Sequence, residues 1–462
     1  MGLSAAMEIG KNGLNIYRVA TEVTGENIAN VNTPGYSRQR VLLETAPPTT
    51  ANGFPMGTGV RIAAVERYYD GLLQQQLVNA QTTQGYDTTK STVLQQIEPT
   101  FNEVAQDGLG AAISNYFAAW QDLTLNPAGS AERQAVLSRA QILTDNFHSA
   151  SKALNDTISI QNSTLVPLTN DINATLNNIA QLNGQIKTTE LVSGNANEIR
   201  DQRDQLVRDL SRQIGITYKE NSDGTADITY ADGGAALVTG ATAGSFSLTT
   251  NAVTGLYDVN VTPPGGAAAL VTPTTGQLGA TLALRDTIIP GYLSQVDTLA
   301  TTIASQVNTQ HKLGFDATGA AGIDFFDPAA TNAATFDINP ALTSTNQIAA
   351  SGNALLIGDN SNALNLAQLQ NQKLMAGNTT TFNSSFDSLV SQVGLDVKSS
   401  KNTEAQDIAF TKQLTTLRES NSGVSLDEEL TNLVKYQRSY QASAKLINTA
   451  TEMMDTVIGL IR

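Results

Sequence analysis

The last 37 residues of the chain carry its most regular pattern of apolar positions. Leu426, Leu430 and Leu433 begin a series with alternating spacings of four and three residues, which is the seam of a helix that packs along another helix. The apolar members of this series are Leu426, Leu430, Leu433, Tyr440, Ala444, Ile447, Met454, Ile458 and Ile461. Ser425 and Glu428 form the pattern of a capping box before the series. A helix of this length, roughly 55 Å, cannot bury the stripe against itself, so we expect it to need a partner.

The N-terminal segment repeats the same spacing, with Leu3, Leu14, Tyr17 and Ile28 among its apolar members. We expect this helix to end near residues 30–32, because the following Thr-Pro-Gly is a turn pattern. Gly10, Gly13 and several threonines weaken the stripe and predict fraying. Two interpretations stay open. The terminal stripes form the edge of an ordinary helical bundle, or the terminal helices pair and their remaining apolar surface contacts other copies.

Helical patterns continue from the N-terminal turn to about residue 214. The expected helices cover residues 71–84, 113–120, 131–154, 168–186 and 195–213. In the last of these, Arg200, Asp204 and Arg208 follow one another at intervals of four. Charges at this spacing are typical of a solvated helix face, which is the interpretation that we favour.

The pattern changes between residues 215 and 275, where Gly, Thr, Asp and Pro interrupt short alternating runs. Asp223-Gly224 between two such runs predicts a β-hairpin. Helical patterns return over residues 292–311, 362–374 and 381–417. The fold class expected is therefore mainly α with a small inserted β domain.

The expected organisation is nested and discontinuous. Residues 1–50 and 420–462 form a layer of long terminal helices paired as in a coiled coil. Residues 51–214 and 276–419 form a helical bundle, and residues 215–275 form an outer β domain.

Composition restricts the function classes. Lys and Arg number 27 against 42 Asp and Glu, giving a formal net charge of −15, which argues against binding to nucleic acid or to an anionic membrane. The chain has no cysteine and two histidines, which removes thiol catalysis and disulfides. We find neither a cleaved signal peptide nor an apolar run long enough to span a membrane.

Few residues suggest chemistry. Asp316, Asp324 and Asp327 lie in a glycine-rich segment and offer oxygen ligands for a hard cation, although a solvated hairpin is the preferred interpretation. His148 fits an ordinary helical position, and Trp120 fits a core. We therefore expect no catalytic residue, no metal site and no cofactor, and a protein that is not an enzyme.

One run of residues resembles a known family. Residues 26–39, Glu-Asn-Ile-Ala-Asn-Val-Asn-Thr-Pro-Gly-Tyr-Ser-Arg-Gln, are similar to the N-terminal signature of bacterial flagellar axial proteins. The ending Thr-Pro-Gly-Tyr-Ser-Arg-Gln is closer to the FlgK family of hook-associated proteins than to hook or rod proteins, which usually have Gly-Phe there. The resemblance assigns an assembly role to the N-terminal helix and signature through Leu3, Leu14, Tyr17, Asn27, Ile28, Asn30, Asn32, Pro34, Gly35 and Tyr36.

Other segments extend the resemblance over most of the chain. Residues 57–70, 126–137, 197–206 and 233–240 are similar to successive segments of the FlgK family, and residues 422–445 resemble its closing helix. Residues 241–275 and 315–350 carry no motif of the family. Because the β insertion is short, an additional outer domain found in longer relatives is not expected.

The resemblance implies a structural role in the bacterial flagellum. Members form a ring of copies at the hook–filament junction, and they contact the hook protein and a second junction protein. They are exported through the flagellar type III channel, without a cleaved signal peptide, to an extracellular location. A cytoplasmic export chaperone is expected on the C-terminal helix. The alternatives are a hook or rod protein of the same superfamily, or a cytosolic enzyme built on a helical scaffold.

Overall fold

The computed structural model describes residues 2–51, 54–101, 108–356 and 358–461, which fall into two compact units. Unit 1 contains residues 1–85, 167–276 and 406–462, and unit 2 contains residues 86–166 and 277–405. Each unit is discontinuous in sequence. The helices α2 (Gly71–Ile97), α4 (Ser130–Ser193) and α9 (Phe382–Ser422) contribute residues to both units.

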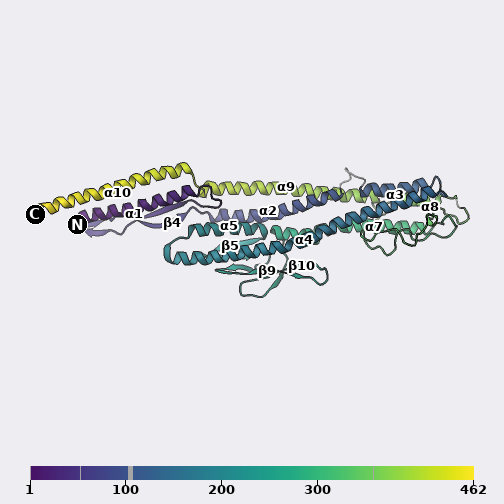
Figure 1. The fold of residues 1–462 in the computed structure, drawn as a ribbon, viewed down its shortest axis with the longest axis horizontal. Coiled ribbons are helices and arrows are strands. Elements are labelled where there is room, and N and C mark those ends of the chain that lie inside the picture. The colour runs from purple at the N-terminus through teal and green to yellow at the C-terminus, as the bar shows by residue number, and fades with distance from the viewer. Residues whose placement is uncertain (1, 52–53, 102–107, 357, 462) are drawn as a thin grey trace. The chain divides into compact units, whose positions relative to one another are not determined.

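The two terminal helices of unit 1 pack along each other. Helix α1 (Gly2–Ala29) and helix α10 (Leu426–Ile461) run antiparallel, so both chain ends lie at the same end of the pair (Figure 1). The predicted end of α1 near residue 30 and the predicted start of α10 at Leu426 are confirmed. Tyr36 N–H donates to Thr33 O at 3.2 Å, and Gly35 has a φ of +82°, as the turn pattern requires.

Two strand pairs follow α1, and the sequence analysis did not predict them. Strand β1 (Gln39–Thr45) pairs antiparallel with β4 (Val60–Arg67), and β2 (Thr49–Ala51) pairs with β3 (Phe54–Met56). A two-stranded sheet is marginal in water by itself. Here β1 and β4 pack against α1, which supplies the support that local pattern cannot reveal.

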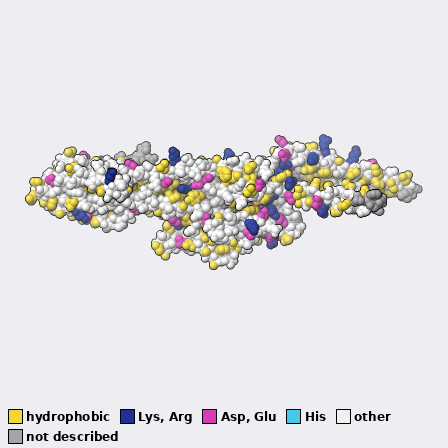
Figure 2. Space-filling model, turned by 180° about the vertical axis from the view of Figure 1, so that it is seen from behind, with side chains coloured by type: hydrophobic (Ala, Val, Ile, Leu, Met, Phe, Trp, Pro, Cys, Tyr) yellow, Lys and Arg dark blue, Asp and Glu magenta, His cyan; other side chains and the backbone are white. Residues whose placement is uncertain are grey.

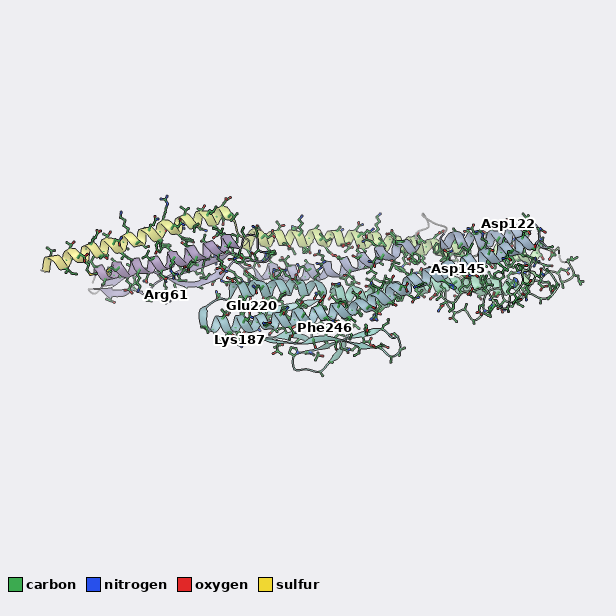
Figure 3. The ribbon with its side chains drawn as sticks, in the orientation of Figure 1. Arg61, Asp122, Asp145, Lys187, Glu220 and Phe246 are labelled. Carbon is green, nitrogen blue, oxygen red and sulfur yellow. The ribbon has the colours of Figure 1, made fainter. Side chains whose placement is uncertain are left out.

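The predicted β insertion is confirmed as two antiparallel sheets in unit 1. The first sheet has the order β5-β6-β7-β8 and the second has the order β11-β10-β9. Their bounds are β5 (Ile216–Glu220), β6 (Ala226–Tyr230), β7 (Ala236–Thr239), β8 (Thr242–Ala243), β9 (Ser245–Thr250), β10 (Tyr257–Thr262) and β11 (Ala269–Val271). Gly224 takes a φ of +80° in the first hairpin. The Asn173 amide on α4 exchanges two hydrogen bonds with the backbone of Phe246, which Figure 3 labels.

The helices predicted over residues 131–154 and 168–186 are one helix, α4, which continues through Pro167. A proline inside a helix removes one backbone hydrogen bond and usually bends or ends the helix. Burial on both sides of Pro167 outweighs this cost, because Leu165, Ile172 and Leu176 are each fully buried. The local proline signal was therefore overridden by packing.

Unit 2 holds the largest apolar core. Trp120, Tyr116 and Phe117 on α3 (Leu109–Leu123) are buried in it, which confirms the prediction that they belong to a core. Tyr116 packs with Phe325 and Phe326, and Trp120 packs with Phe325; both phenylalanines come from the long connection after α7 (Ile289–His311). The remaining helical elements of the chain are α5 (Asn197–Gln213), α6 (Gly276–Ala283), α8 (Ser361–Gln368), a π-helical turn Leu284–Ile288, and 3-10 turns Glu98–Phe101, Thr345–Gln347 and Leu369–Asn371.

Candidate functional site

The contact between α1 and α10 is made close by small residues. A Cβ atom on Gly10 would lie 2.6 Å from Ile447 Cγ1, and one on Gly13 would lie 2.6 Å from Ser443 Oγ. The helices can therefore approach only because these positions lack side chains. Tyr17 and Tyr436 stack further along, with ring centroids 6.4 Å apart. The glycines that appeared to weaken the N-terminal stripe are the points of closest packing.

Asn27 connects α1 to both the following strand and α10. Its Oδ1 accepts from the Tyr36 hydroxyl and from Gln39 N–H, each at 2.9 Å. Its Nδ2 donates to Gln39 O at 2.9 Å and to Glu429 Oε2 at 3.1 Å. Burial raises the pKa of Tyr36, so its hydroxyl remains a donor throughout the physiological range. All the hydrogen-bonding capacity of this buried amide is thus used within unit 1.

Arg38 holds the first turn of α10. Its Nη1 lies 2.6 Å from Glu428 Oε2, and its Nη2 lies 2.7 Å from Glu429 Oε1. Glu429 is buried, whereas Glu428 is exposed. The N-terminus of a helix favours carboxylates, so Arg38 and the helix dipole stabilise the same two charges. Glu428, which the sequence pattern assigned to a capping box, bonds this arginine.

The other predicted N-terminal residues have different surroundings. Leu3, Leu14, Tyr17 and Ile28 are half-buried, whereas Asn32 and Pro34 are exposed. Asn30 donates from Nδ2 to Glu26 O at 3.1 Å and accepts at Oδ1 from the Thr33 hydroxyl. Arg418 on α9 donates to Gly35 O at 2.5 Å. The turn at residues 33–36, which we call the signature turn, is therefore held by side chains from α1 and α9.

The predicted stripe on α10 divides into two groups. Leu433, Ala444, Ile447 and Met454 are half-buried, and Ile447 contacts α1. Leu426, Leu430, Tyr440 and Ile458 are each between 42 and 56 % exposed. The side chain of Ile461 lies outside the described part of the chain. Val434, Leu446, Met453, Val457 and Leu460 are further exposed apolar residues of this helix.

A group of buried charges on α5 and at the end of β4 was missed by the sequence analysis. We call Arg67, Asp201, Arg203, Asp204 and Arg208 the buried charge cluster; they are nearly inaccessible to solvent. The expectation that Arg200, Asp204 and Arg208 form a solvated face is wrong for the last two, because the β insertion and the N-terminal segment cover α5. Only Arg200 remains half-exposed. A spacing of four places residues on one face but does not tell what covers that face.

Asp201 connects the signature segment to α5. It accepts from Ser37 N–H at 2.7 Å and from the Ser37 hydroxyl at 2.8 Å, and Arg67 Nη1 lies 2.6 Å from its Oδ1. Burial raises the pKa of Asp201, although Arg67 and Ser37 oppose that shift. The same Arg67 nitrogen lies 2.8 Å from Asp204 Oδ2. A buried carboxylate with this many donors remains charged only while they are in place.

The arginines of the cluster bond to the β insertion and to α2. Arg203 donates to Gly224 O at 2.6 Å and to Glu220 Oε1 at 2.9 Å, and Figure 3 labels Glu220. Arg208 donates to Gln74 Oε1 at 2.7 Å. Burial, together with the nearby Arg418, lowers the pKa of Arg208 to about 10. The cluster therefore joins the signature segment, the β insertion, α2 and α5 within unit 1.

The residues considered for chemistry bond to their own loops and helices. Asp316 accepts from the Thr318 hydroxyl and Ala320 N–H, Asp327 accepts from Ala329 N–H, and Asp324 pairs with Lys312. Across the described ranges, no group of three or more acidic or histidine residues is arranged to hold a metal ion. His148 is half-buried. In the part of the chain that the structure covers, no helix has both the length and the apolarity to cross a membrane.

An open groove lies between the signature turn and the helices α4 and α5. Its volume is about 640 Å³. Asn30 and residues 33–36 form one wall, and Asn178, Gln181 and Gln185 of α4 also line the groove. Glu198 and Gln202 of α5 line it as well. The groove is open, so an external group can enter it.

Comparisons with known proteins agree on one family. The family model described as the helical domain of flagellar hook-associated protein FlgK matches residues 94–326, half of the chain. Models for the C-terminal part of the basal body rod proteins FlgEFG and for flagella basal body rod proteins match residues 418–460 and 7–36.

Curated relatives align over nearly the whole chain. Flagellar hook-associated protein 1 of Escherichia coli (strain K12) is 27 % identical over 548 aligned positions that cover 99 % of this chain and 100 % of the relative. The protein of that name from Bacillus subtilis (strain 168) is 27 % identical over 494 positions that cover 98 % and 97 %. Because this chain has 462 residues, both alignments include residues of the relative without a counterpart here.

A solved structure has the same fold. The flagellar hook junction protein FlgK from Burkholderia pseudomallei matches with a TM-score of 0.68 at 19 % identity, over 76 % of this chain and 100 % of that one.

Proposed function

Because the chain belongs to the family of the flagellar hook-associated protein FlgK, an axial component of the flagellum, we propose that it forms the junction between hook and filament. In this proposal a ring of copies assembles through the terminal helices and contacts the hook protein on one side and a second junction protein on the other. The family is one of structural flagellar proteins rather than of enzymes, and the role of this chain is to join parts.

The observation that carries the proposal is the apolar surface left on α10. After α1 has packed along the helix, Leu426, Leu430, Val434, Met453 and Ile458 are still about half exposed. Figure 2 shows apolar side chains gathered over the end of unit 1 that carries the terminal helices. Burying each such side chain fully is worth about 1.5–3 kcal/mol. Exposed apolar surface of this kind marks an interaction site, and other axial subunits are the partners that the family offers.

The exposed apolar surface of α10 also bears on how the chain is exported. A helix that exposes this much apolar area needs protection before assembly, so we assign α10 as the segment that a cytoplasmic export chaperone holds. The chain would leave the cell through the flagellar type III channel by an uncleaved N-terminal segment. After assembly, residues 1–50 and 420–462 would form the inner layer, residues 51–214 and 276–419 a bundle layer, and residues 215–275 a domain that faces solvent.

Substitution on the exposed face of α10 tests the proposal more sharply than deletion of the helix. Deletion would also remove Glu428 and Glu429, which Arg38 and Asn27 need. We expect Leu430→Glu with Ile458→Glu to abolish incorporation into flagella and to weaken chaperone binding, while the circular dichroism of the monomer is unchanged. Thr431→Glu, at an exposed polar position of the same turn, is the control and should incorporate normally.

Electron microscopy of labelled protein decides between the two axial roles. Label confined to the tip of the hook supports the junction. Label along the whole hook or in the rod would overturn the proposal in favour of a hook or rod protein. The match of residues 94–326 to the FlgK helical domain favours the junction, because the rod models match only segments near the two ends of the chain.

A further inference from the structure

The groove of unit 1 has walls that suit a polar helix or peptide. Gln181, Gln185, Gln202 and Asn178 line it, and their side-chain amides can both donate and accept hydrogen bonds. Leu182 and Leu206 add apolar surface. A space of about 640 Å³ is large enough for several side chains of a partner.

One wall of the groove carries the carboxyl group of Glu198, and a second carboxyl lies beside it. Glu198 of α5 lines the groove, and the carboxyl group of Glu26 on α1 lies close enough to interact with it. The interaction with Glu198, burial and the repulsion between the two carboxylates raise the pKa of Glu26 to about 7. Neither carboxyl forms an ion pair with any described residue, in contrast to Asp201, which Arg67 neutralises.

Two further acidic groups, Tyr36 and Asp201, lie near this carboxyl pair, while Arg418 and Arg208 bond to Gly35 and Gln205 of the groove. The negative charges of Glu26, Glu198 and Asp201 lie close to Tyr36 and contribute to its raised pKa. The two carboxyls can avoid repulsion in only two ways. They share a proton, or they receive a cation from outside unit 1.

The same chain offers a matching basic face on α10. Lys435, Arg438 and Lys445 are exposed, and none of them forms an ion pair within the described ranges. Arg438 and Lys445 each follow by two residues a side chain that faces α1, Tyr436 and Ser443 respectively. Two residues correspond to about 200° around a helix, so this basic face points away from α1.

We propose that the groove of one copy receives the basic face of α10 from a second copy, with Arg438 and its neighbouring lysines placed against Glu26 and Glu198. This inference rests on the proposed self-assembly and names one of its interfaces. Charge complementarity selects the occupant, since the chain as a whole carries a net charge of −15 and cationic faces are scarce on it. The groove and the basic face are different surfaces of one chain. The contact is therefore heterologous and can repeat from copy to copy, as a ring requires.

The interface should depend on pH in a defined direction. In the free groove Glu26 holds a proton below about pH 7, and an incoming arginine or lysine displaces that proton. Association should therefore weaken as the pH falls from 8 to 6, by up to about tenfold for each pH unit below 7. Glu26→Gln should remove most of this dependence.

Cysteine cross-linking tests the interface directly, because the natural chain has no cysteine. The full chain carrying Gln202→Cys in the groove and Thr449→Cys on the basic face of α10 is produced in cells that lack their own copy, and isolated flagella are oxidised. We expect a ladder of disulfide-linked copies. The matched control replaces Thr449→Cys by Thr451→Cys, also exposed but about 200° away around the helix, and should give no ladder.

Charge exchange provides the second readout. Glu198→Lys and Arg438→Glu should each reduce incorporation at least tenfold, and the double variant should recover most of it. Three outcomes would overturn the interface while leaving the junction role intact. They are equal cross-linking through the control and test positions, cross-links only to another flagellar protein, and undisturbed incorporation of both single variants. If the unaltered chain does not enter flagella at all, the proposed function fails, and this interface fails with it.

Discussion

Asn27 and Asp201 show how single polar residues fix the N-terminal segment. Both are buried, and each bonds to residues far away in the sequence: Asn27 to Glu429, and Asp201 to Ser37 and Arg67. A buried polar group is costly unless it is hydrogen-bonded, so the signature residues can occupy these places only in the complete fold of unit 1.

His311 in unit 2 makes the stability of the protein dependent on pH. Its Nδ1–H donates to Ile323 O at 2.6 Å, and its Nε2 accepts from Ala349 N–H at 2.9 Å, so the ring is neutral. Burial lowers the pKa of His311 from 6.5 to about 4. Between these values the unfolded chain binds a proton that the folded chain does not, so the free energy of unfolding falls as the pH drops from 6.5 to 4. The full loss is about 3 kcal/mol.

The single tryptophan of the chain reports on this change. Trp120 lies with its ring centroid 6.1 Å from that of His311, so urea unfolding followed by its fluorescence reads unit 2. We expect the urea concentration at the midpoint of unfolding to decrease as the pH is lowered from 6.5 to 4. In His311→Gln the midpoint should depend less on pH. Another group would be responsible if the urea midpoint did not change with pH in this range, or if it changed as strongly in the variant as in the unaltered protein.

At the scale of elements, α1 and α10 pair through glycines rather than through a continuous apolar seam. We predict that Gly10→Val separates the two helices, because its side chain would overlap Ile447 and Ser443. Such overpacking typically costs about 1–3 kcal/mol. Hydrogen exchange of α1 and α10 amides should accelerate by roughly tenfold or more.

The same substitution at Gly25 is the control. A Cβ atom there meets nothing within 4 Å, so Gly25→Val changes only the local helix preference. Equal exchange rates in the two variants would contradict the close packing of the terminal helices.

At the scale of the whole molecule, the buried charge cluster belongs to unit 1 alone. We predict that Asp201→Asn destabilises unit 1 by about 3–5 kcal/mol, because it leaves Arg67 buried without a full counter-charge. Hydrogen exchange should accelerate in residues 1–85, 167–276 and 406–462. The Trp120 transition of unit 2 should not move.

Asp209→Asn serves as the control for this prediction. Asp209 lies on the same helix but is exposed, and its substitution should change stability by less than about 0.5 kcal/mol. Loss of protection in unit 2 after Asp201→Asn would show that the cluster supports more than its own unit.

Periodicity and turn residues determined much of this fold. The terminal helices, the turn at Gly35, the β insertion and the aromatic core around Trp120 were all predicted, because each follows from spacing or from local backbone preference. The prediction of separate helices over residues 131–154 and 168–186 was wrong, and the strands after α1 were not predicted, because packing by distant segments outweighs the local signals. The role of the predicted stripe on α10 in assembly stays a prediction.

The sequence by itself determined which residues can share a helix face, and through the resemblance to the FlgK family it indicated an axial role in the flagellum. Only the tertiary structure decided which faces are covered. The charges of α5 are buried because the β insertion and the N-terminal segment close over them. Several apolar residues of α10 remain exposed because α1 covers a different face, the one that carries Ser443 and Ile447. Burial depends on segments that are hundreds of residues apart, and a pattern within one helix contains no information about them.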